Sequence, residues 1–203
     1  MNLKNIIIFC LAVSVSRAAW ADLDIIAGIG GTSYEYEVNS GSTTNTESQN
    51  LSGSTTIRLG VGMSVNDWFK VEGLYVAYGR ATTGYYFSVN NSTVEEYDYE
   101  MKPSALVAQA LASYPLGEKY SLFGKLGIAS WRYTVNSSLV RSVGGNVQFS
   151  GSDSGVDPLY GVGLERKLES GSRLRVDYEK LTLRSERDIK MSQIGFSYIY
   201  PLN

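Results

Sequence analysis

Histidine is absent from this 203-residue sequence, and its single cysteine, Cys10, lies close to the N-terminus. Without histidine, a Ser-His catalytic triad and a metal site built on imidazole are both excluded. Proline is also scarce, with four residues, whereas glycine (21 residues) and tyrosine (15 residues) are abundant. Such a composition favours strands and turns over helices.

The first 21 residues have the features of a secretory signal peptide. Lys4 supplies a positive charge, residues 6–15 are apolar, and Ala19-Trp20-Ala21 has the small-x-small form of a cleavage site. A transmembrane helix, the alternative interpretation, needs about 18 apolar residues in a row, and this run is much shorter. We therefore predict a signal peptide at residues 1–21 and one mature domain at residues 22–203.

The predicted mature chain contains no cysteine, and no lipobox surrounds Cys10 in the removed segment. An exported chain without disulfides must be stabilised by its core or by a membrane. Loss of Lys4 and Arg17 leaves 16 basic residues against 20 acidic ones, a net charge of about −4 that argues against nucleic acid as a partner. If the mature chain enters a membrane, it must do so as a closed barrel, because lipid cannot satisfy an open strand edge.

Residues 56–66 give the clearest strand signal. The apolar residues of this segment occupy every second position: Ile57, Leu59, Val61, Met63 and Val65. The positions between them are small or charged: Arg58, Gly60, Gly62 and Ser64. Strict alternation is typical of a strand, and in an outer-membrane barrel the apolar face meets lipid while the other face lines the lumen. Gly60 is then luminal, and we expect Gly60→Ser to be mild.

Seven further segments complete an even number of strands. Alternation recurs at residues 23–30, 160–165, 174–179 and 194–200. Residues 71–79 and 105–112 are apolar or small on both faces, and in the first of these we interpret Glu72 and Arg80 as pointing inward. The last segment, residues 121–133, carries Lys125 near its centre. The fold class predicted is therefore all-β, an eight-stranded antiparallel up-and-down transmembrane barrel.

The connections alternate between short and long. Short ones fall at residues 66–67, 115–119 and 169–172; long ones fall at residues 37–54, 81–100 and 134–157, and a brief one lies near residues 185–188. Short periplasmic turns with long extracellular loops are typical of outer-membrane barrels. The long segments are rich in Ser, Thr, Asn and Gly, so we expect them not to order themselves.

Aromatic residues lie near both ends of the predicted strands, and carboxylates occur in the long connections. We predict one aromatic girdle near the short turns, comprising Trp68, Phe69, Tyr114, Tyr120, Tyr198 and Tyr200. We predict a second one towards the long loops, comprising Tyr34, Tyr36, Tyr78, Trp131 and Tyr133. We interpret Glu95, Glu96 and Asp98 as solvated loop residues, and the spacing of Asp153 and Asp157 lacks a calcium-loop pattern.

Several of these segments resemble a known family. Residues 114–116 (Tyr-Pro-Leu), 122–127 (Leu-Phe-Gly-Lys-Leu-Gly) and 131–132 (Trp-Arg) are similar to the second periplasmic turn and fifth strand of the OmpA-like transmembrane domain. Residues 160–165, 174–178 and 192–198 resemble its last three strands. The resemblance is strongest over residues 102–200, about half of the mature chain.

The resemblance implies a set of luminal ion-pair or gate residues. By position, Glu72 and Arg175 correspond to a carboxylate and an arginine that pair inside the barrel and act as a gate. Glu165 resembles a second luminal glutamate, and Lys125 resembles a luminal cation on the fifth strand. Leu111 stands where the family has a lysine, so Lys125 is expected to serve Glu165 instead.

The resemblance also implies partners. The family ends on an aromatic residue read by the barrel-assembly machinery, which Tyr200 matches, with Tyr198 and Phe196 before it and residues 201–203 after it. Periplasmic chaperones, outer-membrane lipid and lipopolysaccharide are the other implied partners, with an extracellular ligand on the long loops. No peptidoglycan-binding domain is expected after the barrel.

These observations predict a non-enzymatic barrel of the Gram-negative outer membrane that contributes to envelope integrity and cell-surface contact, with no cofactor. Two alternatives stay open, a small gated porin and a surface adhesin or serum-resistance factor. An eight-stranded interior is filled by side chains, so free diffusion through it requires a gate to move. A soluble periplasmic β-sandwich is disfavoured by the charged inner faces.

Overall fold

The computed structural model describes residues 23–38, 47–89, 93–141, 147–184 and 188–202. The predicted signal peptide and its cleavage site lie outside these residues. The described chain forms nine strands: β1 (Leu23–Val38), β2 (Glu47–Ser64), β3 (Phe69–Ala77), β4 (Ala81–Val89), β5 (Thr93–Pro115), β6 (Tyr120–Arg141), β7 (Val147–Lys167), β8 (Arg173–Leu183) and β9 (Ile189–Leu202). Within these ranges, no helix is long and apolar enough to cross a membrane.

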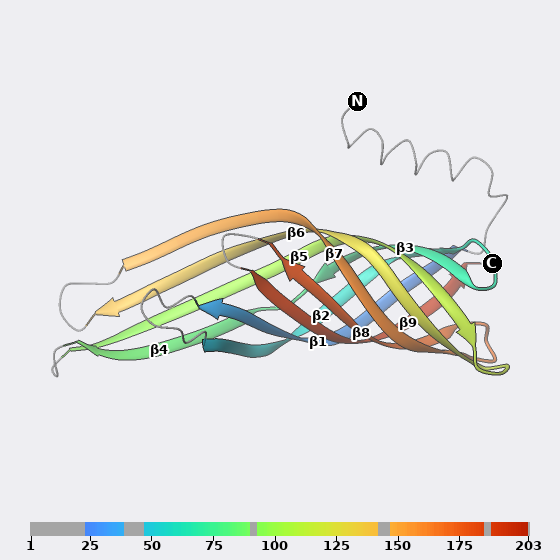
Figure 1. Cartoon of the computed structure of the whole chain (residues 1–203), viewed down its shortest axis with the longest axis horizontal. Helices are drawn as coiled ribbons and strands as arrows, with labels where there is room; N and C mark the ends of the chain where they lie inside the picture. Colours follow the sequence, from blue (N-terminus) through green and yellow to red (C-terminus); the bar gives the residue numbers. More distant parts are fainter. Residues whose placement is uncertain (1–22, 39–46, 90–92, 142–146, 185–187, 203) are drawn as a thin grey trace, which may run out of the picture.

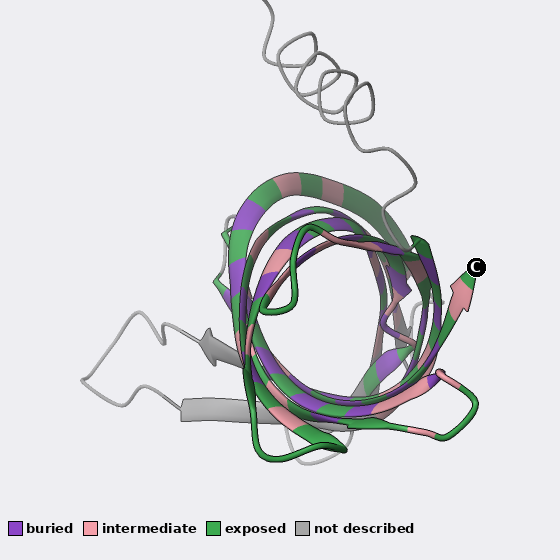
Figure 2. Ribbon diagram, turned by 90° about the vertical axis from the view of Figure 1, so that its right-hand side faces the viewer, coloured by how far each residue is buried: buried purple, intermediate pink, exposed green. Residues whose placement is uncertain are grey.

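The strands close into a barrel in which every pairing is antiparallel (Figures 1 and 2). β1 pairs with both β2 and β9, which joins the first and the last strand of the chain, and the pairing of β3 with β5 completes the barrel. β3 and β4 pair in succession with β5, at Ser104–Ala112 and Thr93–Met101, so they are two parts of a single strand. The predicted eight-stranded up-and-down transmembrane barrel is confirmed.

The break between β3 and β4 occurs at Gly79, whose φ of 51° lies in the left-handed region. A Cβ at this position would lie 2.2 Å from the carbonyl oxygen of Thr55, so only glycine fits there. The break interrupts the alternation: Tyr78 and Ala81 are buried, and Arg80 between them is exposed. The prediction that Arg80 points inward is therefore wrong.

The barrel wall has an apolar outer face. Side chains such as Ile29, Leu59, Leu106, Leu126 and Ile194 are 55–70% exposed, whereas their inward neighbours along each strand are buried or half-buried (Figure 2). A continuous apolar belt of this kind is stable in lipid and not in water. Inward and outward facing therefore follow the alternation seen in the sequence. Glu72 is buried in the lumen as predicted, and Leu74 and Val76 on the same strand are buried beside it.

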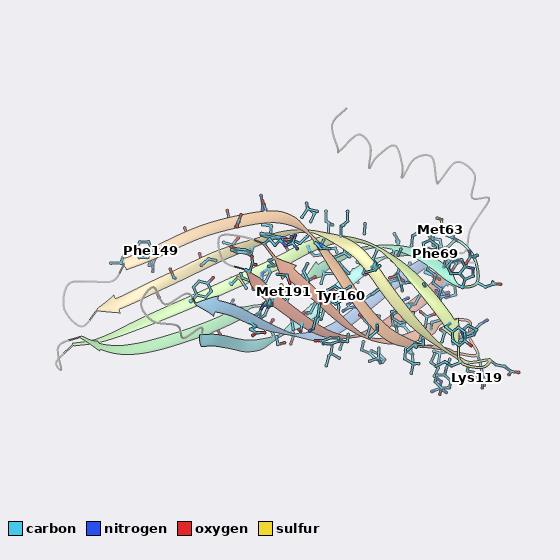
Figure 3. The ribbon with its side chains drawn as sticks, viewed as in Figure 1. Met63, Phe69, Lys119, Phe149, Tyr160 and Met191 are labelled. Atoms are coloured by element: carbon cyan, nitrogen blue, oxygen red, sulfur yellow. The ribbon has the colours of Figure 1, made fainter. Side chains whose placement is uncertain are left out.

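The two ends of the barrel differ in their connections. At one end, short turns are closed by backbone hydrogen bonds such as Val65 N to Phe69 O (2.9 Å), Leu116 N to Tyr120 O (2.7 Å) and Leu168 N to Ser172 O (2.8 Å). These turns are where the sequence predicted them. Figure 3 shows Lys119 at this end and Phe149 at the other.

At the other end, the long connections contain more regular structure than expected. β5 and β6 stay paired from Pro115–Ser121 out to Glu95–Arg141, and β6 and β7 out to Leu139–Val147, so residues 93–100, 134–141 and 147–157 are strands. These hairpins project well beyond β8 and β9 (Figure 1). The expectation that such polar segments would not order is wrong here, because the backbone ladder satisfies their polar groups without apolar burial. The side chains of residues 93–98 lie outside the described ones.

The two predicted aromatic girdles have different outcomes. Trp68, Tyr114, Tyr120, Tyr198 and Tyr200 near the short turns are 42–69% exposed, as predicted, whereas Phe69 of the same girdle is half-buried. The second girdle is wrong, because Tyr34, Tyr78 and Trp131 are at most 2% exposed and Tyr133 stacks on Trp131 with ring centroids 5.6 Å apart. The side chain of Tyr36 lies outside the described ones. These rings occupy inward positions of the alternation, so they fill the lumen.

Candidate functional site in the barrel lumen

Charged side chains on the inward faces gather into two groups inside the barrel. The group nearer the short turns, here the turn-side network, comprises Asp24, Lys70, Glu72, Glu165, Arg173 and Arg175. The group beyond it, here the central network, comprises Arg58, Lys125, Asp177 and Glu179. Each side chain is held there because its strand alternates charged with lipid-facing residues.

Arg175 is the hub of the turn-side network. Its Nη2 lies 2.8 Å from Glu72 Oε1 and 2.9 Å from Glu165 Oε2, and Nη1 donates to Glu72 Oε2 at 3.0 Å. Gln109 Nε2 also donates to Glu72 Oε2, at 2.7 Å. The guanidinium carbon of Arg175 lies 5.0 Å from the centroid of the Phe123 ring. The structure thus brings together Glu72, Arg175 and Glu165, all three of which the resemblance singled out.

Glu165 connects Arg175 to further cations that the sequence analysis did not single out. Lys70 Nζ lies 2.8 Å from Glu165 Oε1, and Arg173 Nε lies 3.2 Å from the same oxygen. Arg173 also pairs with Asp24 across the β8–β9–β1 wall. Lys70 follows a turn and two aromatic residues. The only sequence feature that marks it as luminal is its two-residue spacing from Glu72.

The central network is built around Lys125. Its Nζ lies 2.5 Å from both Asp177 Oδ2 and Glu179 Oε2, and Arg58 Nη1 lies 3.0 Å from Asp177 Oδ2. The expectation that Lys125 serves Glu165 is therefore wrong. Leu111, the residue opposite Lys125 on β5, is buried. The alternating Arg175, Asp177 and Glu179 on β8 were visible in the sequence, but their partners lie on strands distant in sequence.

Both networks are balanced in charge. The turn-side network holds three cations and three carboxylates, and the central network holds two of each. A buried ion needs a close partner because its desolvation costs several kcal/mol, on the order of the energy that the pair recovers. Room for Arg58 is provided by Gly195, where a Cβ would lie 2.3 Å from Nη2 of Arg58. The arrangement can hold charge inside a narrow lumen without leaving an ion unpaired.

Towards the hairpin end the filling of the lumen becomes apolar. Here the apolar cluster is formed by large buried side chains, each at most 2% exposed: Tyr34, Tyr78, Met101, Trp131, Leu159, Leu181, Leu183 and Met191. Two of their polar groups are bonded locally: the Tyr34 hydroxyl donates to the Tyr78 carbonyl oxygen at 2.7 Å, and Trp131 Nε1 donates to Asp157 Oδ2 at 2.7 Å. Asp157 thus holds a tryptophan in the barrel.

The acidic side chains of the described residues do not form the grouping that a metal ion needs. No three His, Cys, Asp or Glu side chains among those residues gather so that they could hold a metal ion. The buried carboxylates of both networks contact cations, which is the arrangement of a structural filling.

The three residues assigned to the assembly signal lie on the outer face of β9. Phe196, Tyr198 and Tyr200 are 42–52% exposed, and the Tyr198 hydroxyl donates to Ser172 Oγ at 2.8 Å. Tyr200 pairs with Ile25 of β1, beside the seam that closes the barrel. Their role in assembly stays a prediction.

Comparison with known proteins places this architecture among bacterial outer-membrane barrels. The family model described as "Outer membrane protein beta-barrel domain" matches residues 6–200. Outer membrane protein A of Serratia marcescens is 28% identical over 145 residues, which is 68% of this chain and 37% of that protein. The chain therefore spans little more than a third of that relative's length.

Two solved structures illustrate the likeness. Neisserial surface protein A is 11% identical, with a TM-score of 0.53 over 88% of this chain and 96% of that one. The N-terminal barrel domain of OprF from Pseudomonas aeruginosa is also 11% identical, with a TM-score of 0.46 over 89% and 98% of the two chains. At 11% identity, the likeness to Neisserial surface protein A concerns the fold alone.

Proposed function

Because this chain belongs to the family of outer membrane protein β-barrel domains, we propose that it is a non-enzymatic, largely non-conducting barrel that contributes to envelope integrity. The observation that carries the proposal is the filling of the lumen. Two charge-balanced networks occupy one half of it and the apolar cluster occupies the other. A barrel filled in this way has rigid walls and no continuous aqueous path.

The non-enzymatic part of the proposal rests on chemistry that the chain does not offer. The whole sequence lacks histidine, and the buried carboxylates Glu72, Glu165 and Asp177 are each engaged by arginine or lysine. A general base must be free to accept a proton from a substrate. These carboxylates stabilise the wall and do not face a substrate cleft.

Planar-bilayer recording of the purified wild-type barrel tests the non-conducting part. We expect rare and small openings, because ions would have to enter the apolar cluster without hydration. A steady open-channel current in the wild type would contradict the proposal. The integrity part is tested separately, by the sensitivity of a deletion strain to detergent and its rescue by the wild-type chain.

Cell-surface contact is the second part of the proposed role, and the projecting hairpins support it. β5, β6 and β7 extend past the apolar belt as a paired sheet. Shortening the hairpins within residues 81–100 and 134–157 should abolish attachment of an extracellular partner while detergent resistance is retained. Loss of detergent resistance with retained attachment would assign the hairpins to the opposite role.

A gated channel is the second candidate, favoured by one observation. Arg175 contacts Glu72 and Glu165 at once, so it can give up one carboxylate while it keeps the other. Such an exchange of partners opens part of the turn-side lumen without leaving the arginine unpaired. It conducts only if the apolar cluster also moves, which bilayer recordings of Arg175→Ala address.

A further inference from the structure

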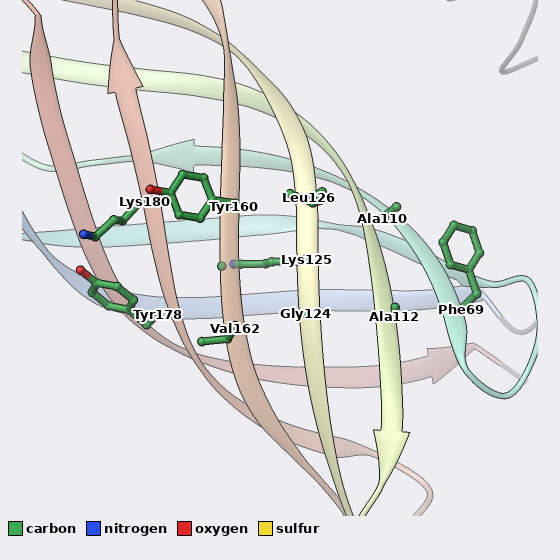
Figure 4. A pocket seen from close by; sticks show the side chains of 11 residues that line it. Phe69, Ala110, Ala112, Gly124, Lys125, Leu126, Tyr160, Val162, Tyr178 and Lys180 are labelled. Carbon is green, nitrogen blue, oxygen red and sulfur yellow. The ribbon is translucent and has the colours of Figure 1, made fainter.

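A groove with a volume of about 690 Å³ crosses the lipid-facing wall of the barrel (Figure 4). It lies over β5 to β8, with Phe69 of β3 at one end and Lys180 of β8 at the other. Its lining is predominantly apolar. The groove opens on the outer wall, with the luminal residue Lys125 forming part of its floor. Neither the family resemblance nor the proposed function assigns a role to this groove.

The groove arises from the size of neighbouring side chains in two cross-strand rows. The first row contains small residues, whereas outward positions elsewhere on the wall carry bulky side chains. In this row Ala112 pairs with Gly124, and Gly124 pairs with Val162. In the second row, Leu126 pairs with Tyr160, and Tyr160 pairs with Lys180. A Cβ added at Gly124 would meet nothing within 4 Å, so the depression beside it is open.

The two ends of the groove differ in chemistry. Phe69 lies immediately after the short turn between β2 and β3, at the periplasmic side. Lys180 lies on the hairpin side of Tyr178, and its Nζ is 5.9 Å from the centroid of the Tyr178 ring. On β8 the outward positions change there from apolar (Val176, Tyr178) to polar (Lys180, Thr182). A cation therefore marks the end of the groove that faces the outer leaflet.

We propose that this groove binds one acyl chain of a lipid A-type glycolipid, with the ammonium of Lys180 contacting a phosphate of the headgroup. An acyl chain that starts at the outer leaflet runs in the direction from Lys180 towards Phe69, along an apolar floor. A lysine at the edge of an apolar belt extends its flexible chain towards the interface, where phosphate groups lie. Van der Waals contact with the walls and one charge-assisted hydrogen bond to phosphate give the site its selectivity.

Native mass spectrometry of the whole barrel tests this inference. The chain is folded into phosphatidylcholine nanodiscs and titrated with lipid A, with dephosphorylated lipid A, and with phosphatidylglycerol. We expect one lipid A per barrel to remain bound on release from the disc. Lys180→Gln should weaken retention by about tenfold, the effect of losing one charge-assisted contact. Lys119→Gln, which removes a cation at the short turns, should leave retention unchanged.

A pair of glycine variants tests the groove itself. Gly124→Leu fills the depression and should release the lipid, whereas Gly73→Leu is the matched control. Gly73 is also exposed on the outer wall, a Cβ there also meets nothing within 4 Å, and it lies outside the groove. Heat-dependent gel mobility verifies that both variants fold.

Four outcomes would overturn the inference. Equal retention of dephosphorylated lipid A removes the role of Lys180, and equal retention of phosphatidylglycerol shows that a phospholipid is the occupant. If neither Gly124→Leu nor Gly73→Leu releases the lipid, the lipid binds elsewhere. A barrel dimer that Gly124→Leu dissociates, with no lipid bound, would assign the groove to a second copy of this chain.

Discussion

The half of the lumen near the short turns is filled by ion pairs, whereas the half near the hairpins is filled by apolar side chains. In the first half, Arg175 contacts two carboxylates and Glu165 contacts three cations, so these two ions each keep a partner when one contact is lost. In the second half, Leu181 lies between Leu159 and Met191 in the cross-strand register. These side chains are held by packing, so they have no alternative ionic partner to move to. The ionic half can rearrange at small cost, and the apolar half cannot.

This difference separates two properties that a filled barrel combines. Exclusion of ions depends on the apolar cluster, because an unpaired ion there would lose its hydration without compensation. Thermodynamic stability is sensitive to single substitutions in the ionic half, because removal of one partner leaves an unpaired buried charge. Four substitutions or conditions test this separation.

The largest effect is expected for Arg175→Ala. The change leaves Glu72 with only Gln109 as a described hydrogen-bond partner, while Glu165 keeps Lys70 and Arg173. A buried carboxylate without a cation should lower the free energy of unfolding by about 3–5 kcal/mol. Urea unfolding in lipid vesicles measures the loss, and bilayer recordings show whether conductance rises with it.

The double variant Glu72→Ala with Arg175→Ala is the control for this prediction. It removes both charges of the pair and should recover part of the stability, since Glu165 still has two cations nearby. A double variant whose loss equals the sum of the two single losses would show that Glu72 and Arg175 are not coupled.

Leu181→Ala is the corresponding change in the apolar half. Leu181 is 2% exposed, and its truncation should lower the free energy of unfolding by about 2–4 kcal/mol through lost contacts and a cavity. An apolar cavity stays dry, so conductance should not rise. Val176→Ala on the lipid face of the same strand is the matched control, with a smaller expected loss. An increased conductance in Leu181→Ala would remove the distinction between the two halves.

The sequence was sufficient to predict which face of most strands meets lipid, because alternation with period two is a local property. It failed where the alternation is interrupted, as at Gly79, where the positive φ turns Arg80 outward. It also failed for Tyr34 and Trp131, which were assigned to a girdle by their place along the chain. Their inward position follows from counting alternate residues from Asp24 and Lys125.

Ion-pair partners were harder to predict than facing. The resemblance singled out Glu72, Arg175, Glu165 and Lys125, and the structure places all four in the lumen. Which carboxylate meets Lys125 depends on the stagger of the strands around the barrel, which alternation along one strand does not contain. Asp177 and Glu179 lie two strands away from Lys125 around the barrel, and no local pattern reports that distance.

A smaller loss is expected for Gly60→Ser, a change that the sequence alone suggested would be mild. Gly60 pairs with Leu74, and a Cβ there would lie 2.2 Å from the carbonyl oxygen of Gly73. Because the obstacle is backbone, relief requires a shift of β2 against β3 and should cost about 1–3 kcal/mol. Gly73→Ser, which points into open space outside the wall, should unfold like the wild type. Equal stability of the two variants would show that β2 can shift against β3 without a cost in free energy.

The smallest effect is expected at an ion pair outside the apolar belt, and it differs in kind from the luminal networks. Glu100 lies on the hairpin extension of β5, where Lys102 Nζ is 2.6 Å and Arg80 Nε is 3.3 Å from Oε1. The hydrogen bond from Lys102, aided by the charge of Arg80, holds the pKa of Glu100 below its ordinary value of 4.5. Its contribution is therefore present above pH 4.5 and is lost as the pH falls through the lowered pKa of the folded state.

A carboxylate chemical-shift titration of Glu100 by NMR measures this pKa. Lys102→Gln should raise the midpoint more than Arg80→Gln does, because the hydrogen bond from Lys102 is the larger cause. Added salt should also raise the midpoint, since exposed charges are screened within about 10 Å at 0.1 M ionic strength. The luminal pairs are shielded by the barrel wall, so added salt should not change their contribution to stability. A Glu100 midpoint that salt and Lys102→Gln leave unchanged would mean that this pair, too, behaves as a buried one.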